Sequence, residues 1–290
     1  MPRGALPSHE CGADTRAGRY RHLEHSGVLR AELIRRVDYS EDAETPGVRI
    51  TREAFSMLYT RYAFARALCQ KKRVLEIACG TGQGLGYLAE DARYVVGGDC
   101  NESLVSWGRR HYGHRLSLLC LDAHTLPFRP GSFEVAILYE ALYYLESPAL
   151  FLAECQRILA QEGLLLICTA NREWPGFNPS RLATRYLSAR ELVGLLWRHG
   201  FEATLYGSPP LTPESMKSKA VRAMRRIGTR LHVIPKTMRG KEFLKRIFLG
   251  PLEPVPAELE VGMAAYQEPI QISAHEAPPF KFLFAVANRR

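Results

Sequence analysis

Apolar positions along the chain follow two spacings, one typical of strands and the other of helices. Between residues 73 and 207, short apolar runs such as 73–78, 94–99 and 133–138 are each followed by a segment with apolar residues every three or four positions. Short runs bounded by turns predict buried strands, and the wider spacing predicts amphipathic helices. Strands that alternate with helices are typical of a parallel sheet covered by helices on both faces.

This pattern predicts an α/β fold with a doubly wound, mostly parallel seven-stranded sheet. Asn101 is the expected N-cap of one helix, and Ser188 with Glu191 forms a capping box at the start of another. The expected strands are 73–78, 94–99, 116–121, 133–138, 164–168, 201–206 and 280–287, with a turn at 161–163 before the fifth. The expected helices are 52–67, 84–92, 102–111, 148–159 and 188–199.

Two parts of the chain fall outside the alternation. Residues 1–50 have weak periodicity, which indicates a flexible N-terminus and the start of a helical cap. The sheet domain then comprises 51–208 and 280–290, and a basic insertion rich in expected helix, 209–279, separates its last two strands. About seventy residues without the strand–helix pattern are too long for an ordinary connection.

Composition and charge narrow the class of protein. The chain has 290 residues, 46% apolar and 24% charged, which is ordinary for a globular protein and argues against global disorder. Its longest apolar runs fall short of the ~20 residues that span a membrane, and its N-terminus has no apolar signal region. The net charge of +9 comes mainly from residues 216–246, which hold eleven Lys or Arg and a single acid.

Seven cysteines are spread along the chain, and no two lie within four residues of each other. That spacing excludes a zinc site built on a C-x₂₋₄-C motif. An odd number of thiols, several of them inside apolar runs, favours a reducing compartment, so we expect a cytoplasmic location.

A glycine-rich turn after the first sheet strand is the most informative motif. It places Glu76 near the end of the strand, followed by Gly80, Gly82 and Gly84 at alternate positions. Glycine lets a ligand approach the backbone closely. The dinucleotide pattern G-x-G-x-x-G fails here, because Leu85 or Tyr87 would occupy the third glycine position. The turn therefore indicates a nucleoside ligand without a pyrophosphate, the alternative being a turn that binds nothing.

Glu76-x-x-x-Gly80-x-Gly82-x-Gly84 resembles the cofactor loop of class I S-adenosylmethionine-dependent methyltransferases. The resemblance continues over about 70–207, and in that family acids equivalent to Asp99 and Asp122 end the next two strands. Residues 128–136 and 157–163 are similar to two further family segments. The departures from the family pattern are Glu134 for aspartate, Gln161 for proline and Glu162 for glycine.

The resemblance implies a Rossmann-like fold, S-adenosylmethionine as cofactor, and a role for particular residues. Asp99 would hold the ribose hydroxyls, and Asp122 with Ala123 would meet the adenine edge. The implied cofactor-binding residues are Glu76, Gly80, Gly82, Gly84, Asp99, Asp122, Ala123 and Tyr139. The implied activity is O- or N-methylation of a small-molecule, sugar or lipid-linked acceptor, with no metal ion. The alternative is a catalytically inactive regulatory or scaffold protein that binds the cofactor.

Residues after the fourth strand are candidates for catalysis. In the family this stretch lines the crevice beside the methyl group, so Glu140 or Tyr143 could accept a proton from an attacking hydroxyl or amine. Their alternative role is packing, and His124 is a weaker candidate base that we expect at the surface. The long loop 171–186 is expected to help close the acceptor pocket. Tyr59, Arg61 and Tyr62 either cover the cofactor or only pack on the sheet.

The basic insertion allows three interpretations. An apolar stripe at helical spacing, from Met216 to Ile234, predicts a lid helix that packs on the domain. The basic residues between these positions are also typical of a helix on an anionic membrane, with residues 216–249 as the contact. Nucleic-acid binding has less support, because Phe243 and Phe248 are the only aromatic residues available for stacking. The sequence does not indicate an oligomeric state.

Overall fold

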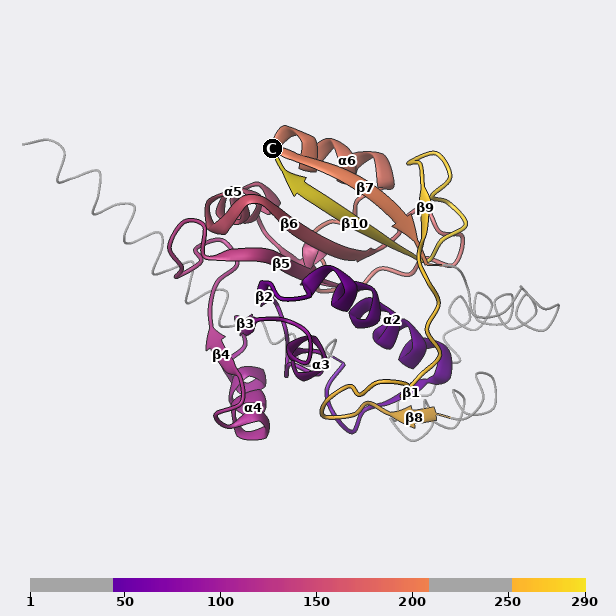
Figure 1. The fold of residues 1–290 in the computed structure, drawn as a ribbon. Coiled ribbons are helices and arrows are strands. Elements are labelled where there is room, and N and C mark those ends of the chain that lie inside the picture. Colours follow the sequence, from indigo (N-terminus) through magenta and orange to yellow (C-terminus); the bar gives the residue numbers. More distant parts are fainter. Residues whose placement is uncertain (1–43, 209–251) are drawn as a thin grey trace, which may run out of the picture. The chain divides into compact units, whose positions relative to one another are not determined.

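A computed structural model describes residues 44–208 and 252–290, which belong to one compact unit, Tyr39–Arg290 (Figure 1). The described residues form an eight-stranded sheet in the order β4-β3-β2-β5-β6-β10-β7-β9. The strands β2 to β6 pair in parallel, whereas β10 is antiparallel to both of its neighbours, β6 and β7. The fold is the expected α/β, mostly parallel and Rossmann-like arrangement.

Seven strands of this eight-stranded sheet correspond to predicted ones. The strands of the sheet are β2 (Arg73–Ile77), β3 (Tyr94–Asp99), β4 (Ser117–Cys120), β5 (Phe133–Tyr139), β6 (Leu159–Ala170), β7 (Phe201–Gly207), β9 (Ile270–Ile272) and β10 (Phe282–Arg289). Two short strands, β1 (Arg49–Thr51) and β8 (Leu252–Pro254), pair antiparallel as a separate ribbon.

Two of the helices begin at the caps that the sequence indicates. The helices are α2 (Arg52–Cys69), α3 (Leu85–Ala89), α4 (Glu102–Tyr112), α5 (Pro148–Ile158), α6 (Ala189–Arg198) and the 3₁₀ turn η2 (Leu142–Tyr144). The Asn101 side chain accepts from the backbone N–H groups of Ser103 and Leu104, which confirms it as the N-cap of α4. Both hydrogen bonds of the capping box between Ser188 and Glu191 are present.

Three local predictions were wrong. The described sheet has eight strands rather than seven, because β9 adds an edge strand beside β7. The predicted turn at 161–163 lies inside β6, which already begins at Leu159. Its pairing with β5 jumps from Leu159 to Leu164, so the intervening residues bulge out, and Glu162 has a φ of 61°. The helix α3 is also shorter than predicted, since it ends at Ala89.

Two apolar layers cover the two faces of the sheet. One contains Phe151 of α5 and Leu192 of α6, and the other contains Leu58 of α2 and Leu88 of α3. Side chains alternate between faces along a strand. In β2, Val74 therefore faces the α2 layer and Leu75 the opposite one, which places the next residue, Glu76, on the α2 side.

The predicted lid helix and the whole basic stretch 216–249 lie outside the described residues. Of the predicted insertion, the structure describes 252–279, which contains β8 and β9. No helix in 44–208 or 252–290 combines the length and the apolar character that crossing a membrane requires.

Candidate functional site

The predicted cofactor residues gather at the carboxyl ends of the parallel strands. The order β3-β2-β5 means that the chain winds away from β2 in one direction to β3 and in the other to β5. Ligands of open α/β sheets bind at such a switch point, beside the carboxyl ends of the strands. Glu76, Asp99 and Tyr139 occupy the ends of these three strands.

The glycine turn between β2 and α3 has a conformation that requires small residues. Gly82 has a φ of 86°, and a Cβ there would lie 2.8 Å from Cδ1 of Leu85. At Gly84 a Cβ would overlap the ring of Tyr62. A side chain at Gly84 would therefore push the turn away from α2.

Asp99 joins the glycine turn to the loop after β3. Its Oδ2 accepts from the Gly80 backbone N–H at 2.8 Å, and its Oδ1 accepts from the Asn101 N–H at 2.8 Å. Burial raises the pKa of the Asp99 carboxyl, and these backbone donors oppose the rise. Each carboxylate oxygen has a second lone pair, so both can still accept from the hydroxyls of a ribose.

Glu76 is the most buried carboxyl of the site, with 1% of its surface exposed. Its Oε1 accepts from the Tyr62 hydroxyl at 2.6 Å, whereas its Oε2 is buried and has no hydrogen-bond partner within the described ranges. The hydroxyl of Tyr139 and the Oγ1 of Thr81 are also buried there without a described partner. Buried polar atoms are almost always hydrogen-bonded, so a ligand or water is needed to complete the hydrogen bonds of these atoms.

Asp122 and Ala123 lie in the loop after β4, as expected. The Asp122 Oδ1 accepts from the backbone N–H of His124 at 2.8 Å and lies 2.6 Å from Nδ1 of the same histidine. The prediction that His124 is a surface residue was wrong, since only 7% of its side chain is exposed. Its Nε2 accepts from the Ser147 N–H, so Nδ1 carries the proton and donates to Asp122. This pair positions Asp122.

Glu140 follows β5 directly and has a φ of 52°, an uncommon conformation for a residue other than glycine. Its Oε2 accepts from the Tyr143 hydroxyl at 3.2 Å, and burial raises the pKa of its carboxyl to about 7. Backbone strain of this kind is often found where a side chain must be aimed at a reacting group. The structure thus brings together the two residues predicted to act in catalysis.

The loop 171–187 packs on the segment that contains Glu140 and Tyr143. The ring of Tyr186 stacks on that of Tyr143 with centroids 4.4 Å apart, and Phe177 meets Tyr186 edge-on. The backbone N–H of Thr184 donates to the Tyr143 carbonyl at 2.7 Å. The loop therefore adjoins the catalytic candidates, and its part in closing an acceptor pocket stays a prediction.

Arg61 and Glu44 belong to the same cluster, and the sequence analysis did not single out Glu44. Arg61 lies on α2, is 7% exposed and forms an ion pair with Glu44. The Glu44 backbone carbonyl in turn accepts from the side-chain amide of Gln83, in the glycine turn. Helical spacing placed Arg61 on a covering helix, but only the tertiary structure shows it as a buried cation among acids.

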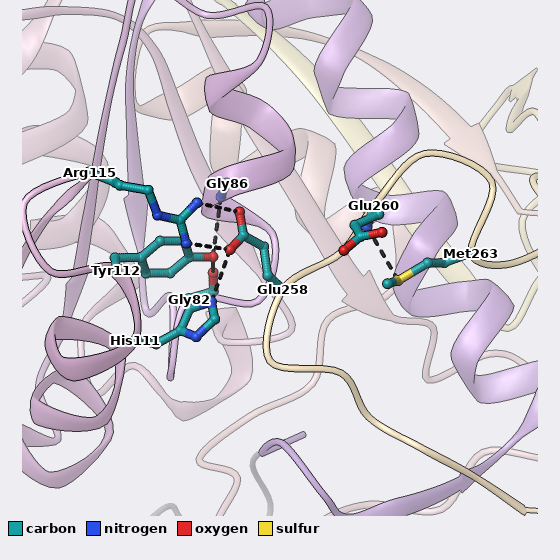
Figure 2. Close-up of polar contacts among 8 residues, drawn as sticks. All are labelled: Gly82, Gly86, His111, Tyr112, Arg115, Glu258, Glu260 and Met263. Atoms are coloured by element: carbon teal, nitrogen blue, oxygen red, sulfur yellow. Dashed lines mark hydrogen bonds and ion pairs between the residues drawn. The ribbon is translucent and has the colours of Figure 1, made fainter.

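The segment 255–263, which follows β8, supports the glycine turn from outside. The Leu259 backbone N–H donates to the Gln83 carbonyl at 2.8 Å. Figure 2 shows the Glu258 carboxylate pointing at His111 and Arg115, with Oε2 at 2.9 Å from Nε2 of His111 and 2.7 Å from Nη2 of Arg115. A Cβ at Gly86 would overlap Glu258, so this approach requires glycine.

The buried carboxyl of Glu76 makes a prediction about pH. Burial raises its pKa from 4.5 to about 8, so between these values the folded state holds a proton that the unfolded state has lost. Stability should therefore fall as pH rises over this range. A Glu76→Gln variant stays neutral, so its stability should not depend on this proton. The melting temperature of the variant minus that of the wild type should therefore increase by at least ~2–4 °C from pH 5.5 to pH 8.5. Parallel thermal melts test this, and a constant difference would contradict it.

Comparisons with known proteins identify the domain. Residues 75–167 match the family described as "Methyltransferase domain". A Mycolicibacterium smegmatis protein named "Probable S-adenosylmethionine-dependent methyltransferase" is 35% identical over 140 residues, which cover 46% of this chain and 53% of that protein. Phthiotriol/phenolphthiotriol dimycocerosates methyltransferase 1 of Mycobacterium ulcerans is 32% identical over 169 residues, which cover 55% and 61% of the two chains. The chain thus spans about half the length of the first of these relatives.

A solved structure shows the same fold. The S-adenosylmethionine-dependent methyltransferase of Thermotoga maritima superimposes with a TM-score of 0.54 at 16% identity, over 81% of this chain and 90% of that one. Residues 75–167 therefore form a methyltransferase domain within a class I methyltransferase fold, and S-adenosylmethionine is the cofactor of the proteins that it resembles. The resemblance noted in the sequence is confirmed at the level of family, fold and cofactor.

The residues of the site fit this cofactor. Asp99 offers acceptors suited to the ribose hydroxyls, and Glu76 and Tyr139 each hold a buried oxygen without a described hydrogen-bond partner. The glycine turn gives a backbone surface without side chains. The roles of the individual residues remain predictions.

Proposed function

We propose that the protein is an S-adenosylmethionine-dependent methyltransferase that methylates oxygen or nitrogen of a small-molecule, sugar or lipid-linked acceptor. The observation that carries the proposal is the pair of Glu140 and Tyr143 at the end of β5, beside the cluster of Glu76, Asp99 and Tyr139. A carboxyl with a pKa of about 7, at the end of a strand that borders the cofactor site, suits a proton acceptor.

The chain's own residues supply position and proton transfer. When bound, the cofactor supplies an activated methyl group on a sulfonium. Glu140 accepts the proton that the acceptor's hydroxyl or amine gives up, and the Tyr143 hydroxyl orients its carboxylate through the 3.2 Å hydrogen bond. Alignment of the reacting atoms supplies much of the rate enhancement in such a transfer.

The acceptor class draws support from the relatives. One is named for methylation of phthiotriol and phenolphthiotriol dimycocerosates, and another is a demethylmenaquinone methyltransferase of Clavibacter sepedonicus, 32% identical over 99 residues. Those names describe the acceptors of other proteins. The tyrosines beside Glu140 are compatible with an acceptor that has a large apolar part.

Transfer of a labelled methyl group tests the proposal. The purified protein, labelled S-adenosylmethionine and fractionated host extract should give label in one fraction, followed by identification of the product. Cofactor binding without transfer into any fraction would favour the alternative, a regulatory or scaffold protein that binds the cofactor without catalysis. Absence of cofactor binding would contradict both.

We further propose that the basic stretch 216–249, which lies outside the described residues, holds the enzyme on an anionic membrane or guides an acidic acceptor. Replacement of Arg222, Arg225, Arg226 and Arg230 by glutamate should abolish sedimentation with anionic vesicles at low salt and leave cofactor affinity unchanged. Salt should weaken wild-type sedimentation, because exposed charges are screened over ~8 Å at physiological ionic strength. Failure of the wild type to sediment at low salt would contradict the membrane role.

A further inference from the structure

Arg61 is a buried cation whose hydrogen bonds are incomplete. Its side chain is 8% exposed, and Glu44 accepts from its Nη2. Its Nε is buried and has no partner among the residues that the structure describes. A guanidinium has five N–H donors in a plane, so the pair with Glu44 leaves donors available. Leaving a buried donor unsatisfied is unfavourable, which indicates that an anionic ligand completes this group.

Several contacts place Arg61 beside the glycine turn and Glu76. Its neighbour on α2, Tyr62, donates to Oε1 of Glu76 at 2.6 Å, and the ring of Tyr62 fills the space beside Gly84. Glu44 links Arg61 to Gln83 of the turn. The positive charge of Arg61 also acts to lower the pKa of Glu76, as expected for close neighbours.

The cluster thus offers a buried cation with a free donor next to a buried carboxyl with a free acceptor, Oε2 of Glu76. An α-amino acid presents the complementary pair, a carboxylate beside an ammonium. We propose that Arg61 binds the carboxylate of the cofactor's amino-acid end, with Glu76 accepting from the adjacent ammonium. This assignment of Arg61 rests on the proposed function. It makes α2 a part of the cofactor site rather than only a helix that covers the site.

The competing explanation is that Arg61 only balances the charge of the surrounding acids. Glu44 forms an ion pair with Arg61, and the charge of Arg61 acts to lower the pKa of both Glu76 and Glu140. A counter-charge would stabilise the fold whatever ligand is bound. A carboxylate-binding residue would instead affect only those ligands that carry the amino-acid group.

Two ligands that differ in this group separate the explanations. S-adenosylhomocysteine carries the amino acid, whereas 5′-methylthioadenosine has the same nucleoside and thioether without it. Titration calorimetry should show that Arg61→Met weakens S-adenosylhomocysteine binding roughly 10- to 150-fold, the loss typical of a hydrogen bond to a charged group. Binding of 5′-methylthioadenosine should change less than about twofold, and Arg61→Lys should recover part of the loss.

Arg66→Met is the matched control. Arg66 lies on the same helix and is ion-paired with Asp91, away from the cluster, so its loss should lower stability but leave both affinities unchanged. Equal weakening of both ligands by Arg61→Met would overturn the proposal in favour of a structural counter-charge, and an unchanged S-adenosylhomocysteine affinity would also overturn it. Failure of the wild type to bind either ligand would instead count against the proposed function.

Discussion

Replacing Glu140 by glutamine is expected to lower kcat by ~10²- to 10⁴-fold on the true substrate, the contribution typical of a general base. The amide keeps the size of the side chain and an acceptor for the Tyr143 hydroxyl, but it cannot take up a proton. Affinity for S-adenosylhomocysteine should be unchanged, because the substitution acts on proton transfer. Initial rates at saturating substrate and calorimetric titration measure the two effects.

The pH dependence of the reaction rate provides a second test of Glu140. Burial raises the pKa of Glu140 to about 7, and its basic form predominates above that value. Wild-type kcat/KM should therefore rise through pH 7 and then level, and this rise should be absent in the variant. Tyr143→Phe should retain the profile with a smaller loss of rate. Glu202→Gln, at an exposed position in β7, is the matched control. Full turnover by Glu140→Gln would remove Glu140 from the mechanism.

Asp99→Ala is expected to weaken S-adenosylmethionine binding by ~1.5–3 kcal/mol, the value for hydrogen bonds to a charged group. The loss has two sources, since the carboxylate would hold the ribose and also accepts from the backbone N–H groups of Gly80 and Asn101. Calorimetry measures the affinity, and a thermal melt shows whether the glycine turn has been destabilised.

Asp99→Asn separates these two sources. Its amide oxygen can accept from one backbone N–H, but the amide nitrogen cannot accept from the other or from a ribose hydroxyl. Binding should therefore weaken, while the melting temperature stays closer to that of the wild type than in Asp99→Ala. Unchanged affinity in both variants would show that Asp99 serves only to hold the turn.

The sequence by itself determined the order of the elements and most of the cofactor loop. Alternation of apolar runs predicted the sheet strands that bear the site, and the capping residues Asn101 and Ser188 correctly marked the starts of two helices. These features depend on neighbours in the chain, and periodicity reports local burial directly. The motif from Glu76 to Gly84 was informative for the same reason, because each glycine acts within a single turn.

Only the tertiary structure decided which side chains share the site and how they are paired. The hydrogen bond from Tyr62 to Glu76, the position of Arg61 and the approach of Glu258 to Gly86 join segments separated by 14 to 172 residues along the chain. The edge strand β9 likewise depends on pairing with β7. Burial and charge act through space, so the raised pKa values of Glu76 and Glu140 arise only when packing removes water and brings the acids around one cation.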